Sequence, residues 1–187
     1  MREHPHTLEP MAIFNLFTKR GKTTPRAQEV PGRIPTVRFD PTRVNKNIKA
    51  DLKQNIRAID DINDEYFDVI FKAALQSIVS GRDLHVLYNA LITVDGMTKS
   101  RASTIALELN NKATALMEGE SRAAIGITHA SWLYSGAPCG DADAEHRAAN
   151  GKVYRISEGL FIAGKWTSPG RESGCRCVSK ALIEGLS

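Results

Sequence analysis

The side chains best suited to chemistry stand near the C-terminal end of the sequence. The three cysteines of the 187-residue chain are Cys139, Cys175 and Cys177, and His146 follows the first of them closely. Three thiolates and one imidazole make a complete tetrahedral set for a structural zinc ion, with no open coordination position. The alternative is a packed cluster of small buried thiols in which a backbone carbonyl satisfies His146. On either interpretation, we expect the four side chains to lie together and to pin the last strand to a helix predicted at residues 141–150.

The spacing of the cysteines favours neither a disulfide nor a standard zinc motif. Cys175 and Cys177 are two residues apart, so on an extended strand their sulfurs point to the same side of the backbone. A disulfide between them would close a very small, strained ring. An odd number of cysteines also argues against a disulfide framework. Metal ligation and buried thiols therefore remain the two interpretations.

The sequence contains no motif typical of an enzyme. A zinc deaminase needs His-x-Glu followed by Pro-Cys-x-x-Cys, whereas here Glu145 precedes His146 and no Cys-x-x-Cys pair exists. A zincin needs two histidines four residues apart on a helix, and a P-loop needs two glycines followed by Lys and Ser or Thr. Neither complete pattern occurs. A cysteine nucleophile paired with His129 or His146 has the residue types it needs, yet three thiols around one imidazole fit ligation better. We predict no catalytic residues.

The elements that must position these side chains follow from the apolar periodicity. From Val44 to Ser80, apolar residues recur every three or four positions, which is typical of helices with one buried face, and a break is expected at Asp60–Asp64. A shorter helix follows over residues 84–94, and another begins near Thr98 or Ser100. After Gly126 the period changes from that of helices to that of strands. Strands are expected at residues 128–134, 152–156, 159–163, 164–168 and 175–183.

These patterns predict an α+β fold in which an N-terminal helical half packs with a small C-terminal antiparallel β-meander. We expect a basic, proline-rich arm over residues 1–43, a helical region over 44–126, and the β-meander with its Cys/His cluster over 127–187. Six of the eight prolines lie in the arm. Because proline interrupts both helices and strand ladders, we expect a partner to order the arm.

Positive charge is concentrated at the start of the chain. Residues 1–57 contain 12 lysines and arginines against five acidic residues, whereas the remainder contains 13 against 16. An anionic partner for the arm is one interpretation, and a solvated tail is the other. The apolar run at residues 11–17 is too short to span a membrane, and we expect no membrane partner. The candidate contacts to an anionic partner are Lys19, Arg20, Lys22, Arg26, Arg33, Arg38 and Arg43.

The order of motifs resembles a known family. "HASWLYSG" is followed by "EHRAANGK", then by "VYRISEGLFIAGKW", and last by "SPGRESGCRC". The most specific parts are His146 with Asn150–Gly151–Lys152, and the segment Pro169–Cys177 that ends in Cys-Arg-Cys. Over roughly residues 99–183, the chain resembles the phage Mu F-like head morphogenesis family, the minor capsid proteins of tailed double-stranded DNA phages.

The resemblance implies a structural protein of the phage head and not an enzyme. It implies a place in the virion near the portal or the inner capsid, assembly in the bacterial cytoplasm, and the portal or major capsid protein as partner. The basic arm would then contact packaged DNA or an acidic portal surface. Two alternatives stay open. One is a zinc-ribbon-like DNA-binding module, and the other is a metal-dependent nuclease or toxin-type enzyme using His129, Asp141 or His146.

Overall fold

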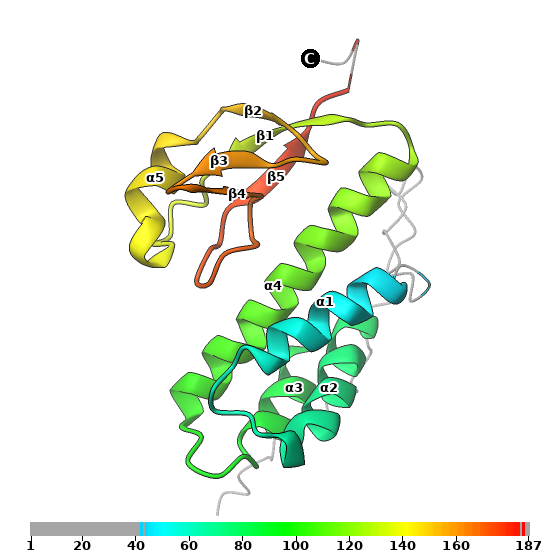
Figure 1. Ribbon diagram of the computed structural model, residues 1–187, viewed down its shortest axis with the longest axis vertical. Coiled ribbons are helices and arrows are strands. Elements are labelled where there is room, and N and C mark those ends of the chain that lie inside the picture. The colour runs from blue at the N-terminus through cyan, green and yellow to red at the C-terminus, as the bar shows by residue number, and fades with distance from the viewer. Residues whose placement is uncertain (1–41, 43, 184, 186–187) are drawn as a thin grey trace, which may run out of the picture. The chain divides into compact units, whose positions relative to one another are not determined.

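Helices followed by short strands make up the part of the chain that the structure describes. The computed structural model describes residues 42, 44–183 and 185, all within one compact unit of the chain. Its first half holds α1 (Lys46–Arg57), α2 (Asp64–Val79), α3 (Leu84–Leu91) and α4 (Lys99–Ala124) (Figure 1). The strands follow, so the α+β class is confirmed. The seven candidate cations of the arm lie outside the described residues: Lys19, Arg20, Lys22, Arg26, Arg33, Arg38 and Arg43.

Short polar side chains set where the four helices begin. The side-chain oxygen of Asn45 accepts hydrogen bonds from the backbone N–H groups of Asn47 and Ile48 at the start of α1. Asn63 caps α2 in the same way, Asp83 caps α3 and Thr98 caps α4. Such caps satisfy N–H groups that have no partner inside the helix. The expected break near Asp60–Asp64 is confirmed, because α1 ends at Arg57 and α2 begins at Asp64.

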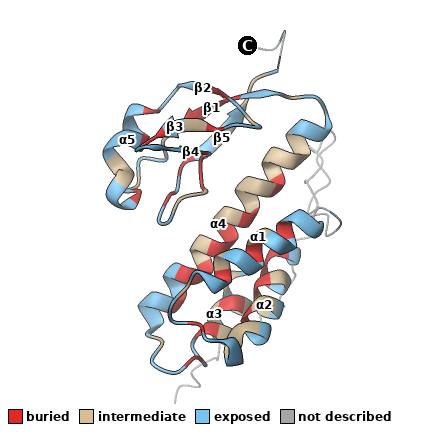
Figure 2. Ribbon diagram, in the orientation of Figure 1, coloured by how far each residue is buried: buried red, intermediate tan, exposed pale blue. Residues whose placement is uncertain are grey.

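The four helices share one hydrophobic core, which Figure 2 shows as the buried faces of α1, α2, α3 and α4. One polar pair lies inside it: the Asn110 side-chain amide donates to Ser77 Oγ at 3.1 Å and to the Ala106 carbonyl at 2.9 Å. No helix within the described residues is long and apolar enough to cross a membrane. The largest fully buried apolar side chains of this core are Ile48, Leu52, Ile56, Ile70, Leu87, Leu91, Ile105 and Leu109.

The strands form two small antiparallel sheets. β1 (His129–Leu133) lies between β2 (Val153–Arg155) and β5 (Val178–Ala181), while β3 (Leu160–Ile162) pairs only with β4 (Lys165–Thr167). The predicted strands are therefore present, and β3 and β4 form one of the predicted tight turns, while β2 pairs with β1 and meets the start of β3 only through a single bridge between Arg155 and Gly159. The turn between β2 and β3 requires a glycine at position 159. With a φ of +82°, Gly159 turns the chain sharply after β2, and a Cβ there would collide with the Thr167 carbonyl.

Polar contacts connect the strands to the helices. Arg171, in the loop after β4, donates from Nη1 to Asp51 Oδ2 on α1 at 3.0 Å and to the Lys112 carbonyl on α4 at 2.9 Å. Arg122, near the end of α4, donates to the Ser179 carbonyl on β5 at 3.0 Å. The side chains of Arg171 and Asp51 are only 26% and 18% exposed. This ion pair therefore fixes the loop that leads to Cys175 against the helices.

Replacing Arg171 with methionine should destabilise the fold by about 2 kcal/mol, because a partly buried carboxylate and a carbonyl both lose a charged donor. Urea unfolding measures the change. Arg101→Met is the matched control, since the Arg101–Asp61 pair is 46% and 41% exposed and should contribute less than about 1 kcal/mol. If the two variants lose equal free energy of unfolding, the Arg171–Asp51 pair does not stabilise the fold more than an exposed ion pair does.

Candidate metal centre

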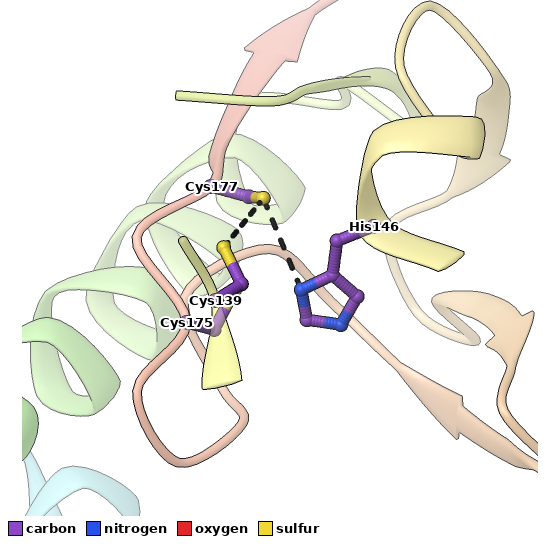
Figure 3. A group of neighbouring side chains, drawn as sticks. All are labelled: Cys139, His146, Cys175 and Cys177. Atoms are coloured by element: carbon purple, nitrogen blue, oxygen red, sulfur yellow. Dashed lines mark hydrogen bonds between the residues drawn. The ribbon is translucent and has the colours of Figure 1, made fainter. Parts of the chain in front are cut away.

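The structure brings the four predicted side chains together. The sulfurs of Cys139, Cys175 and Cys177 and a ring nitrogen of His146 all lie within 4.8 Å of one another (Figure 3). Cys139 Sγ is 3.5 Å from Cys177 Sγ, and Cys177 Sγ is 4.0 Å from His146 Nδ1. All four residues are buried, with exposures of 0–3%. The described residues contain no other group of three or more His, Cys, Asp and Glu side chains that could hold a metal ion.

Three separate segments supply these ligand atoms. Cys139 lies in the loop after β1, just before a 3-10 turn at Gly140–Ala142, and His146 lies on α5 (Asp143–Ala148). Cys175 and Cys177 lie in the segment before β5, so the prediction that the last strand starts at residue 175 is wrong. The backbone there still alternates, since Cys175 and Cys177 are buried while Arg176 is exposed. The two sulfurs therefore share one side, as their spacing predicted.

Asp143 holds the Cys139 loop against α5. Its Oδ1 accepts hydrogen bonds from the Tyr134 hydroxyl at 2.8 Å and from the Cys139 backbone N–H at 2.9 Å. Its Oδ2 pairs with Arg147 one turn later at 3.0 Å. The Tyr134 hydroxyl, followed by the Cys139 N–H, lowers the pKa of Asp143 below its usual value. Sequence reasoning missed Asp143, because nothing in a helix-prone acidic segment marks one carboxylate as the partner of a loop.

The Asn150–Gly151–Lys152 motif fixes the end of α5 to β1. Asn150 Oδ1 accepts from the Tyr134 N–H at 3.0 Å, and the Gly151 N–H donates to the Trp132 carbonyl at 2.7 Å. The backbone N–H of Trp132 donates in turn to the Lys152 carbonyl at 2.9 Å. Gly151 has a φ of +80°, a conformation that favours glycine over residues with a side chain. The motif therefore positions His146 relative to the central strand.

Burial sets the protonation of the cluster. It raises the pKa of Cys175, and together with the neighbouring Cys175 it raises the pKa of Cys177 to about 12. Burial lowers the pKa of His146 more than the nearby carboxylates of Glu172 and Asp143 raise it. The imidazole is therefore neutral at neutral pH, which is the form that binds metals, whereas each thiol that becomes a ligand must release its proton.

Backbone N–H groups face two of the sulfurs. The Gly170 N–H donates to Cys175 Sγ at 3.3 Å, and the Arg176 N–H donates to Cys139 Sγ at 3.5 Å. Hydrogen bonds of this kind stabilise a charged acceptor more than a neutral one. Burial alone favours the protonated thiols, but these two hydrogen bonds would stabilise Cys175 and Cys139 once a metal ion holds them as thiolates.

The donor set and its spacing fit zinc. With Zn–S bonds of about 2.3 Å, the ligand atoms of a tetrahedral site stand about 3.8 Å apart; the separations of 3.5 and 4.0 Å are close to this, and those of up to 4.8 Å would shorten by about 1 Å on binding. The packed-thiol alternative required a carbonyl partner for His146. Among the described residues, the buried Nε2 atom has no hydrogen-bond partner, and Nδ1 faces Cys177. The cluster could therefore hold a metal ion, and zinc is the ion that three thiolates and one imidazole favour.

The other candidate residues lie apart from this cluster. His129 and Asp141 are both exposed, and neither belongs to the group of potential metal ligands. His129 instead forms a hydrogen bond through Nδ1 with the hydroxyl of its neighbour Thr128 at 2.8 Å. Of the three residues considered for a nuclease, only His146 reaches the cluster.

Comparison with known proteins gives one match. The family model described as "Phage Mu protein F like protein" matches residues 68–180, which run from α2 into β5 and include all four cluster residues. No curated protein and no solved structure matches the chain.

Purified protein should contain about one zinc ion per chain, and His146→Ala should remove it, because three thiolates leave the tetrahedral site incomplete. Elemental analysis measures the zinc, and His129→Ala is the matched control that should keep it. Chelation should lower the melting temperature of the wild-type protein by roughly 10 °C, if zinc stabilises the folded state by about 4 kcal/mol. A chelator that leaves the melting temperature unchanged would contradict a structural metal.

Asp143→Ala should weaken zinc binding about tenfold, which is the usual effect of removing a group that orients a metal ligand. Competition with a zinc-binding dye measures the affinity. Glu145→Ala makes the same charge change at an exposed neighbouring position on α5 and should leave the affinity unchanged. Equal affinities in the two variants would show that Asp143 does not position Cys139 for ligation.

Proposed function

Because the chain belongs to the phage Mu protein F-like family, we propose that it is a minor capsid protein with a structural role in phage head morphogenesis. The family match carries this proposal, since it covers more than half of the chain and includes the whole cluster. The protein would reside in the phage head, near the portal or the inner capsid, after assembly in the host cytoplasm. Its partners would be the portal protein, the major capsid protein, or both.

A closed metal centre supports a structural role over a catalytic one. Catalytic zinc keeps one coordination position for water or substrate, whereas three cysteines and one histidine fill all four. In the proposed protein, Cys139, His146, Cys175 and Cys177 hold zinc as a staple between α5 and the segment that leads into β5. A metal-dependent nuclease would need further groups around the ion, and neither His129 nor Asp141 is among them.

The experiment that tests this role uses the phage or prophage that encodes the chain. Deleting the gene should abolish infectious heads or leave malformed ones in electron micrographs, and expression of the wild-type chain in trans should restore them. Mass spectrometry of purified heads should find the protein. Normal infectious heads without the protein would overturn the proposal.

The basic arm, residues 1–43, would bind packaged double-stranded DNA or an acidic portal surface. Its charge supports this part of the proposal, because residues 1–43 carry eight basic against four acidic side chains. Each phosphate that a cation neutralises releases counterions, so DNA binding through the arm would weaken steeply with salt.

If the arm binds DNA with all seven candidate cations, the slope of log affinity against log salt concentration should be about −6. Replacing the seven with glutamine should flatten the slope, as measured by fluorescence anisotropy on duplex DNA. The control variant removes exposed cations from α1 and α2 instead, by combining Lys46→Gln, Lys49→Gln and Lys72→Gln. It should change the slope of log affinity against log salt concentration little. Affinity that survives loss of the arm charges but disappears on zinc removal would favour the zinc-ribbon-like DNA-binding alternative instead.

A further inference from the structure

One buried donor beside the cluster has no acceptor. Trp132 on β1 is 0% exposed, and its indole N–H has no hydrogen-bond partner among the described residues. Buried polar groups in folded proteins are nearly always hydrogen-bonded. An unpartnered indole N–H in the centre of a small core therefore needs an explanation.

The position of Trp132 points to the cluster. Its ring packs against the His146 ring, with centroids 5.0 Å apart, and against the Tyr154 ring at 6.4 Å. In the β1–β5 register Trp132 lies opposite Ser179. Cys177 precedes Ser179 by two residues in an alternating backbone, so its side chain lies on the same face, diagonal to Trp132.

We infer that the indole N–H of Trp132 donates a hydrogen bond to the Cys177 thiolate when the cluster holds its metal ion. This inference rests on the metal centre proposed above. A neutral thiol is a poor acceptor and leaves the indole N–H without a partner, whereas a metal-bound thiolate carries negative charge and attracts it. Trp132 is therefore a positioning residue that raises the affinity of the site for metal.

Because the Trp132 ring packs against His146, its fluorescence can report metal binding to the cluster. The chain contains two tryptophans, and the other, Trp166 on β4, is 63% exposed. In a Trp166→Phe background, the fluorescence of Trp132 should therefore respond to metal binding next to its ring. The full chain in this background is the reference protein for the test.

The test replaces Trp132 with β-(3-benzothienyl)alanine, which keeps the shape of the indole but has sulfur in place of the N–H. Zinc affinity should fall about tenfold. With cobalt(II) as the probe, the sulfur-to-metal charge-transfer band should move to lower energy, because a thiolate without the hydrogen bond gives up its electron more easily. A purely structural role for Trp132 would not move this band.

Tyr154→Phe is the matched control. It removes the hydroxyl that donates to Ser179 Oγ at 2.6 Å, from a ring that packs on Trp132, and should lower stability while leaving the cobalt band in place. If the benzothienyl variant keeps the zinc affinity and the cobalt charge-transfer band of the reference protein, the inference about Trp132 is wrong, although the metal centre itself is not contradicted. Failure of the reference protein to bind zinc or cobalt would overturn both. Trp132→Phe, measured alongside, should lose at least as much affinity as the isostere, because it removes the N–H and also part of the ring that packs on His146.

Discussion

The strand unit depends on the convergence of three thiols and one imidazole. Among the described residues, eight apolar side chains are buried in its core, and three of them are the cysteines. The other five, with the partly buried Tyr134, Ile156 and Leu160 around them, make a small core, and a metal is one way in which small cores are stabilised. A metal shared by Cys139, His146 and the Cys175–Cys177 segment would join parts of the chain that lie far apart in sequence. The position of β5 beside β1 would then follow from ligation.

The Asn150–Gly151 part of the family motif and the neighbouring Asp143 each have a structural explanation. Asn150 and Gly151 shape the turn that returns the chain from α5 to β1, and Asp143 ties the Cys139 loop to the same helix. These contacts fix the segments that carry Cys139 and His146, and that arrangement supports the structural role proposed above.

Much of the fold could be predicted from the sequence, because it depends on local patterns. The helices follow from apolar spacing, and Thr98 caps the start of α4 with its side-chain oxygen, as predicted. The gathering of the four ligands followed from residue type. The pairing of β2 with β1 could not be predicted, since strands of three residues carry too little pattern to select a partner. The role of Asp143 was also missed. Its carboxylate accepts a hydrogen bond from the backbone N–H of Cys139, and a contact to a backbone group cannot be read from the types of the residues.

X-ray absorption at the zinc edge shows whether the cluster is a closed zinc site. On the purified protein, we expect three sulfur ligands at about 2.3 Å and one nitrogen at about 2.0–2.1 Å, with no oxygen ligand. An oxygen in the first shell would mean an open site and would favour a catalytic metal. Absence of zinc, with all three cysteines reacting as free thiols in the folded protein, would contradict the account altogether.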